Sequence, residues 1–160
     1  MKKVILCAFI VFSVTPIFIP VYAEKKIEDE IKYRQSAMMF MRWNMGKIKQ
    51  QVVKHPESFK KDQVIAAANV IASIANSGLG ELFGEHTRGG TGWKKTRAKD
   101  ALYDDPEEVS KRAKIFRQEA NRLSTVSRNG DIENIAIQFD KTFKSCKGCH
   151  KKFREKKPKT

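Results

Sequence analysis

The sequence predicts an all-α protein folded as an antiparallel four-helix bundle. Apolar residues recur at steps of three, four and seven along most of the chain after residue 24, which is the spacing of one face of an α-helix. No segment alternates apolar and polar residues as a half-buried strand would, and no internal repeat occurs. Four amphipathic stretches separated by glycine- and proline-bearing turns are typical of a helical bundle with one core.

Residues 1–23 resemble an export signal, and residues 24–160 would then form a single domain. The signal has a lysine pair, an apolar run and a small-residue cleavage site at Val21-Tyr22-Ala23. The alternative is a retained N-terminal anchor, because the apolar run is near the lower length for a membrane span. If residues 1–23 are an export signal, we expect the mature protein to be located in the periplasm.

The chain is strongly basic, with 32 Lys and Arg against 18 Asp and Glu. Nucleic acid is a usual partner of such chains, but an exported protein does not meet it. We expect acidic protein partners, redox partners among them, or anionic membrane headgroups. Basic residues concentrate in residues 151–159; a solvated helix end is the other interpretation of that run.

The first two helices are predicted at residues 24–53 and from Ser58 to Ser77-Gly78. The first ends at His55-Pro56, because a residue before proline avoids the α region. Ser58 is the expected N-cap of the second helix, and the glycine after Ser77 stops it. The apolar face of the first helix consists of Ile27, Ile31, Met38, Met41, Met45, Ile48 and Val52.

The stretch from residue 79 to 105 is predicted to be a compact loop, because its glycines argue against a long helix. We expect one short helical turn within it, near residues 94–102. Loops of this length in small domains are usually functional or packed by their own side chains.

The last two helices have clear start signals. Asp105 followed by proline and two acids predicts a cap for the third helix, which ends at Asn129-Gly130. Asp131 caps the fourth helix, whose apolar stripe continues through Phe153. The chemically distinctive residues of the chain lie on that stripe.

Cys146-Lys147-Gly148-Cys149-His150 has the spacing of a c-type haem attachment site. On a helix, residues three and four apart share a face, so both thiols and the imidazole can point at one macrocycle. The sulfurs would form thioethers, and the imidazole would be the proximal iron ligand. Cys7 would leave with the signal, so no cysteines remain for a disulfide framework.

The motif has three other interpretations. A dithiol redox centre is expected in a βαβ context, which is missing here. A zinc site needs about four ligands, and His55 and His86 stand alone in predicted turns. A structural histidine beside two chance cysteines is the third. We expect no enzyme, since the sequence has no nucleophile–base pair, phosphate loop or paired catalytic carboxylates.

The chain resembles the cytochrome c′ family, including its low-spin c-556 relatives, over nearly all of the predicted mature chain. The resemblance rests on residues 33–38 (YRQSAM), on residues 82–87 with the glycines after them, and on Phe139 seven residues before the first cysteine. It rests also on a haem motif near the C-terminus with Arg154 one turn beyond. The family implies a four-helix bundle with one covalent haem c.

The resemblance implies a role for each matching residue. Cys146 and Cys149 would hold the haem, and His150 would be the proximal ligand. Arg34 would contact a haem propionate, for which a guanidinium fork is suited. Gln35 would lie near the propionates, and Arg154 would line the proximal face of the pocket.

Met38 occupies the family's distal position, where many members carry leucine. It is a candidate distal axial ligand, which would raise the haem potential and suit electron transfer. It is equally a cover for the distal face of a five-coordinate haem that binds NO or CO.

The expected function is that of a periplasmic c-type cytochrome for single-electron transfer, with NO or CO binding at the distal face. The alternatives are a gas-binding or gas-sequestering haem protein without a dedicated redox partner, and a non-haem cationic helical module with a CxxC zinc or redox site. The family also implies a homodimer through the first two helices, for which the side bearing Met41 and Met45 is a candidate contact.

Overall fold

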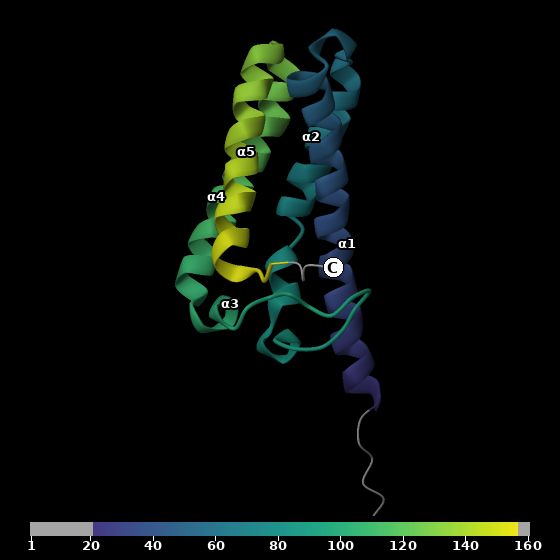
Figure 1. Ribbon diagram of the computed structural model, residues 1–160, viewed down its shortest axis with the longest axis vertical. Coiled ribbons are helices and arrows are strands. Elements are labelled where there is room, and N and C mark those ends of the chain that lie inside the picture. Colours follow the sequence, from purple (N-terminus) through teal and green to yellow (C-terminus); the bar gives the residue numbers. More distant parts are fainter. Residues whose placement is uncertain (1–20, 157–160) are drawn as a thin grey trace, which may run out of the picture.

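The structure is a computed structural model that describes residues 21–156, in which four long helices run side by side in alternating directions (Figure 1). This confirms the predicted all-α bundle. Residues 1–20, which carry most of the predicted export signal, lie outside the described residues. No described helix is both long enough and apolar enough to cross a membrane. The helices are α1 (Val21–Lys49), α2 (Lys61–Ala75), a short α3 (Ala101–Asp104), α4 (Pro106–Asn129) and α5 (Ile132–Phe153).

The core is formed where α4 packs against both α2 and α5, and α1 packs against α2. Its centre consists of aliphatic side chains that water does not reach. Burial of this apolar surface is the main favourable term in folding. The fully buried members from the four long helices include Ile48, Val64, Ile71, Leu123 and Ile135. The half of α1 that precedes this core is left to contact the long loop and the end of α5.

Both predicted aspartate caps are confirmed. Asp105 Oδ1 accepts the Glu108 backbone N–H at 3.2 Å, and Asp131 Oδ1 accepts that of Asn134 at 2.8 Å. The carboxylate of Asp105 also accepts a hydrogen bond from Lys152, and the two contacts lower the pKa of this carboxyl group. Side chains thus satisfy a backbone donor at the start of both α4 and α5.

The predicted cap of α2 is wrong, and that helix begins later than predicted. Ser58 lies in a separate 3₁₀ turn, and its hydroxyl donates to the His55 carbonyl at 2.8 Å. The helix begins at Lys61 without a side-chain cap; instead, Gln51 Oε1 accepts the Lys60 backbone N–H. α1 ends at Lys49 and continues as one π-helical turn, Gln50–Lys54.

The loop from residue 79 to 105 lies against α1 and the end of α5 (Figure 1). It contains two 3₁₀ turns, Leu79–Phe83 and Glu85–Thr87. Its predicted helical turn at 94–102 begins only at residue 101, because residues 97–99 pair with the chain end. There Lys99 N donates to Phe153 O at 3.0 Å and Glu155 N donates to Arg97 O at 2.8 Å.

A glycine is required where this loop meets α1. A Cβ atom on Gly92 would lie 2.7 Å from the Lys32 backbone nitrogen and 3.0 Å from Gln35 Oε1. Backbone atoms cannot move aside as a flexible side chain can, so any larger residue would push the loop off the helix. The loop therefore connects α1 directly to the C-terminal end of α5.

The predicted dimer contact on α1 is wrong in its residues. Met41 and Met45 are only 7% and 9% exposed and belong to the interior. The apolar residues that α1 does present to solvent are on another side of the helix. They include Met39, Phe40 and Trp43, and the rings of Phe40 and Trp43 stack with centroids 5.6 Å apart.

Candidate haem-binding site

The CxxCH motif is helical throughout and forms the last turns of α5. Its two cysteines are free thiols, and they and His150 are all half-buried. The regular helix therefore presents both sulfurs and the imidazole along one side, as the spacing predicted. The preceding turns add stacked aromatic rings, Phe139 and Phe143, with centroids 6.2 Å apart.

Both thiols are protonated in their surroundings. Burial raises the pKa of Cys146, although a hydrogen bond with Ser145 opposes the shift, and burial also raises that of Cys149, opposed by the charge of Arg112. Disulfide exchange uses the thiolate, so the raised pKa values favour unreactive thiols over a dithiol redox centre.

A group of side chains that could bind a metal ion is not found in the part of the chain that the structure describes. Within it, no group of three or more His, Cys, Asp or Glu side chains could hold an ion. The two other histidines contact carboxylates instead: His86 Nε2 lies 2.6 Å from Glu30 Oε2, and His55 Nδ1 lies 3.2 Å from Glu57 Oε1. Neither can complete a zinc site with the cysteines.

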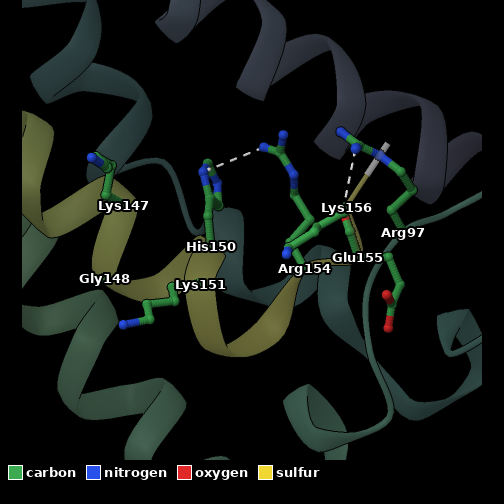
Figure 2. Close-up of a pocket in the computed structure, with 8 residues that line it drawn as sticks. All are labelled: Arg97, Lys147, Gly148, His150, Lys151, Arg154, Glu155 and Lys156. Atoms are coloured by element: carbon green, nitrogen blue, oxygen red, sulfur yellow. Dashed lines mark hydrogen bonds between the residues drawn. The ribbon is translucent and has the colours of Figure 1, made fainter. Parts of the chain in front are cut away.

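The surroundings of His150 favour its neutral imidazole form, which is the form that binds a metal. Burial lowers its pKa, and the charges of Arg154 and Arg97 lower it further. A histidine pKa below its ordinary value favours the uncharged ring at neutral pH, which has one unprotonated nitrogen. Arg154 Nη1 donates to His150 Nδ1 at 3.3 Å, as Figure 2 shows.

A pocket of about 510 Å³ opens beside this imidazole (Figure 2). Its walls come from the last turns of α5, from residues 154–156 that follow them, and from Arg97 in the long loop. Five of the lining residues are cations and one is an acid, so the pocket is strongly basic. The lining residues are Arg97, Lys147, Gly148, His150, Lys151, Arg154, Glu155 and Lys156.

Arg34 anchors the long loop to α1. It is only 3% exposed, and its guanidinium donates to Thr87 Oγ1 at 2.6 Å, to Thr87 O at 3.1 Å and to Thr96 Oγ1 at 2.7 Å. It also donates to Leu82 O and lies 4.9 Å from the centroid of the Phe83 ring. These acceptors are neutral, and Arg34 forms no ion pair within residues 21–156.

Gln35 has a similar role one residue on. Its Nε2 donates to Lys94 O at 2.7 Å, and its Oε1 accepts from Lys94 N at 3.2 Å. Residue patterns predicted neither loop contact. The sequence indicated only that the loop would be packed by its own side chains. The acceptors Thr87 and Thr96 have no helical spacing, so no pattern marked them as partners of α1.

Met38 is half-buried on α1, one turn before Arg42. The helix α1 contacts α5, and burial together with the charges of Arg97 and Arg42 lowers the pKa of Arg154. Met38 shares a face of α1 with Arg42, because residues four apart lie on one side of a helix.

Arg112 on α4 is a neighbour of the motif that the sequence gave no reason to expect. Its Nη1 would lie 3.1 Å from a Cβ atom on Gly148, and its Nη2 pairs with Glu108 Oε1 at 2.6 Å. Its Nε is buried and has no hydrogen-bond partner within residues 21–156. Only the packing of α4 on α5 brings this side chain to Cys149, and no local pattern encodes that packing.

The comparisons with known proteins agree with this geometry. A family model described as Cytochrome C′ matches residues 29–154. The chain is 44% identical to a cytochrome c′ of Rhodocyclus tenuis, covering 82% of this chain and 97% of the relative. It is 43% identical to a cytochrome c′ of Allochromatium vinosum, covering 81% and 82%.

Solved structures give the same result. The crystal structure of cytochrome c′ from Thermochromatium tepidum is 41% identical, with a TM-score of 0.76 over 81% of this chain and 97% of that one. A second cytochrome c′ structure, at 42% identity and the same TM-score and coverage, is described as having an unusual ligand-controlled dimer dissociation. A ferrous arginine-to-lysine variant of the Alcaligenes xylosoxidans protein, with bound NO, is 27% identical with a TM-score of 0.71, covering 82% and 97%.

Proposed function

Because this chain belongs to the cytochrome c′ family, whose members carry covalent haem c, we propose that it is a periplasmic carrier of single electrons that also binds NO, and that it is not an enzyme. The observation that carries the proposal is the CxxCH motif at the end of α5, with a neutral, half-buried imidazole beside an open pocket. Family membership also argues against the non-haem alternative with a zinc or redox CxxC.

In this proposal Cys146 and Cys149 hold the haem by thioethers and His150 ligates its iron. When bound, the haem supplies a one-electron iron couple and an axial position for a small gas. Since a guanidinium only donates, His150 Nδ1 accepts from Arg154 and the ring proton lies on Nε2. Ligation through Nε2 would place the proton on Nδ1 and release Arg154, which could then lie along the proximal side of the pocket.

The predicted propionate contact of Arg34 stays part of the proposal. A buried cation without a carboxylate partner is costly, because hydrogen bonds to neutral groups replace its hydration only in part. A propionate brought close to Arg34 would supply the counter-charge. Gln35 and the loop that it anchors would border the same group.

A gas-binding protein without a redox partner is the second candidate. It is supported by relatives: nitric oxide complexes were solved for three leucine-substituted variants of the Alcaligenes xylosoxidans protein, which are 28% identical to this chain. The leucine of those variants has no assigned equivalent here, but Met38 is the residue that we place at the distal face.

Met38 determines whether the haem has a thioether ligand or is five-coordinate, and the visible spectrum distinguishes the two. We expect Met38 to cover the iron without ligating it. The purified ferrous protein should then show one broad visible band. Met38→Ala should keep that band and speed CO association on the order of tenfold, equivalent to ~1.4 kcal/mol of barrier. Stopped-flow mixing with CO measures this. Sharp, separate α and β bands that vanish in Met38→Ala would show instead that the thioether is an axial ligand.

We further propose that the protein forms homodimers through the exposed apolar side of α1, at Met39, Phe40 and Trp43. Trp43 is 57% exposed, although indole rings are favoured at protein–protein contacts. Trp43→Glu should weaken the dimer on the order of 100-fold, as measured by sedimentation equilibrium. Ile115→Glu, on an exposed site of α4, is the control and should leave the dimer intact. A wild-type monomer at micromolar concentration would refute this contact.

A further inference from the structure

The pocket beside His150 is rimmed by five cations that have no acidic partner among residues 21–156. We define this cationic rim as Arg97, Lys147, Lys151, Arg154 and Lys156 (Figure 2). Within the described residues none of the five forms a salt bridge with a carboxylate. Neighbouring lysines do: Lys144 pairs with Asp140 at 2.6 Å and Lys152 with Asp105 at 2.8 Å. No carboxylate of the described residues therefore neutralises the charge of the rim.

Four of the five rim residues also lie in the most basic part of the chain. Residues 141–160 contain nine lysines and arginines and one acid, Glu155, in a protein whose net charge is +14. Glu155 lines the same pocket, but its contact with Arg97 uses the backbone carbonyl, at 3.2 Å, and not the carboxylate. Like charges held together repel one another and destabilise the fold. An external anion would offset that repulsion.

We propose that the cationic rim is the docking surface for an acidic electron-transfer protein, an inference that rests on the proposed function. The rim is spread over the surface around the haem-bearing turn of α5, where the aspartate and glutamate side chains of a partner can reach several of its cations at once. The guanidinium groups of Arg97 and Arg154 can each bind a carboxylate through two parallel hydrogen bonds. Lys147, Lys151 and Lys156 add point charges around them.

Docking here places a partner beside the haem-bearing turn of α5. Opposite charges raise the rate of encounter by 10-fold to 10³-fold, and salt removes much of that gain. With haem bound, one electron would pass from the partner's reduced cofactor to the ferric haem. The partner's cofactor would lose that electron, the haem would gain it, and no covalent bond would form or break.

A charge-relocation experiment tests the rim with a defined acidic probe. The probe is a fully reduced flavodoxin of net negative charge, mixed in a stopped-flow instrument with the ferric mature holoprotein. Lys151→Glu/Lys156→Glu reverses two exposed members of the rim. Lys60→Glu/Lys61→Glu is the matched control, because it makes the same change in net charge at the start of α2, at the other end of the bundle (Figure 1).

At low salt the rim variant should be reduced about tenfold more slowly than wild type, and the control by less than about twofold. The difference should vanish near 0.5 M salt. Equal slowing of the two variants would mean that only net charge matters and would overturn the proposal. Unchanged reduction, with loss of binding to phosphatidylglycerol vesicles in the rim variant alone, would identify a membrane surface instead. A purified protein without a haem absorbance band would overturn the proposed function itself.

Discussion

Replacing Cys146 and Cys149 together by serine should abolish covalent haem attachment. Each thioether needs a sulfur on the side of α5 that also carries His150, and serine oxygen forms no such bond with a vinyl group. In cells that carry a c-type maturation system, the double variant should give no coloured band when a denaturing gel is stained for haem. Single variants should stain more weakly than wild type, because one link remains.

The control for this experiment is Cys7→Ser, which alters the remaining cysteine of the sequence. We predict that Cys7 belongs to a removed signal, so this variant should stain as wild type does. Mass spectrometry of the secreted protein should then show one haem per chain and an N-terminus at Glu24. A stained band that persists in the Cys146→Ser/Cys149→Ser variant would contradict the assigned attachment site.

Local patterns sufficed for the helices and for the haem motif. The spacing of apolar residues predicted four long helices, and the acid at each expected start predicted the Asp105 and Asp131 caps. These features depend on residues within one or two turns of each other. The motif was also predictable, because its chemistry requires a fixed spacing within a single helix.

The errors occurred where contacts outside a helix decide the local structure, either across a turn or between distant segments. Ser58 is a good cap by residue type, but the Gln51 side chain satisfies the Lys60 backbone N–H across a turn. The helical turn expected at 94–102 is displaced because residues 97–99 pair with the end of α5. Hydrogen bonds between segments more than fifty residues apart leave no periodic signal in the sequence.

Arg34 shows the same limit at the candidate site. The resemblance supplied a propionate partner for it, and the structure shows in addition that its guanidinium binds the loop through Thr87 and Thr96. Sequence alone gives the residue type and its helix, but not which acceptors a long loop brings to it. The size of that second role can be measured.

Arg34→Leu should lower the free energy of unfolding by about 3–5 kcal/mol, among the larger costs of a single substitution. Leucine leaves the Thr87 and Leu82 carbonyls and both threonine hydroxyls without this donor, in a place where Arg34 itself is 3% exposed. Arg34→Lys should recover only part of the loss, because an ammonium group cannot reproduce the planar fork. Urea unfolding followed by circular dichroism gives these values, and limited proteolysis should show cleavage within residues 79–105.

Arg128→Leu is the matched control, since Arg128 also donates to neutral side chains, Asn69 and Ser124, but is exposed. It should cost less than about 1 kcal/mol. Measuring Arg34→Leu again in the Cys146→Ser/Cys149→Ser background separates the two roles of Arg34, because the difference between backgrounds is the coupling energy of Arg34 with the haem. An anchor of the loop costs the same in both backgrounds. A cost confined to the haem-bearing protein would show that Arg34 acts through the propionate alone, and that its contacts with Thr87 and Thr96 contribute little to stability.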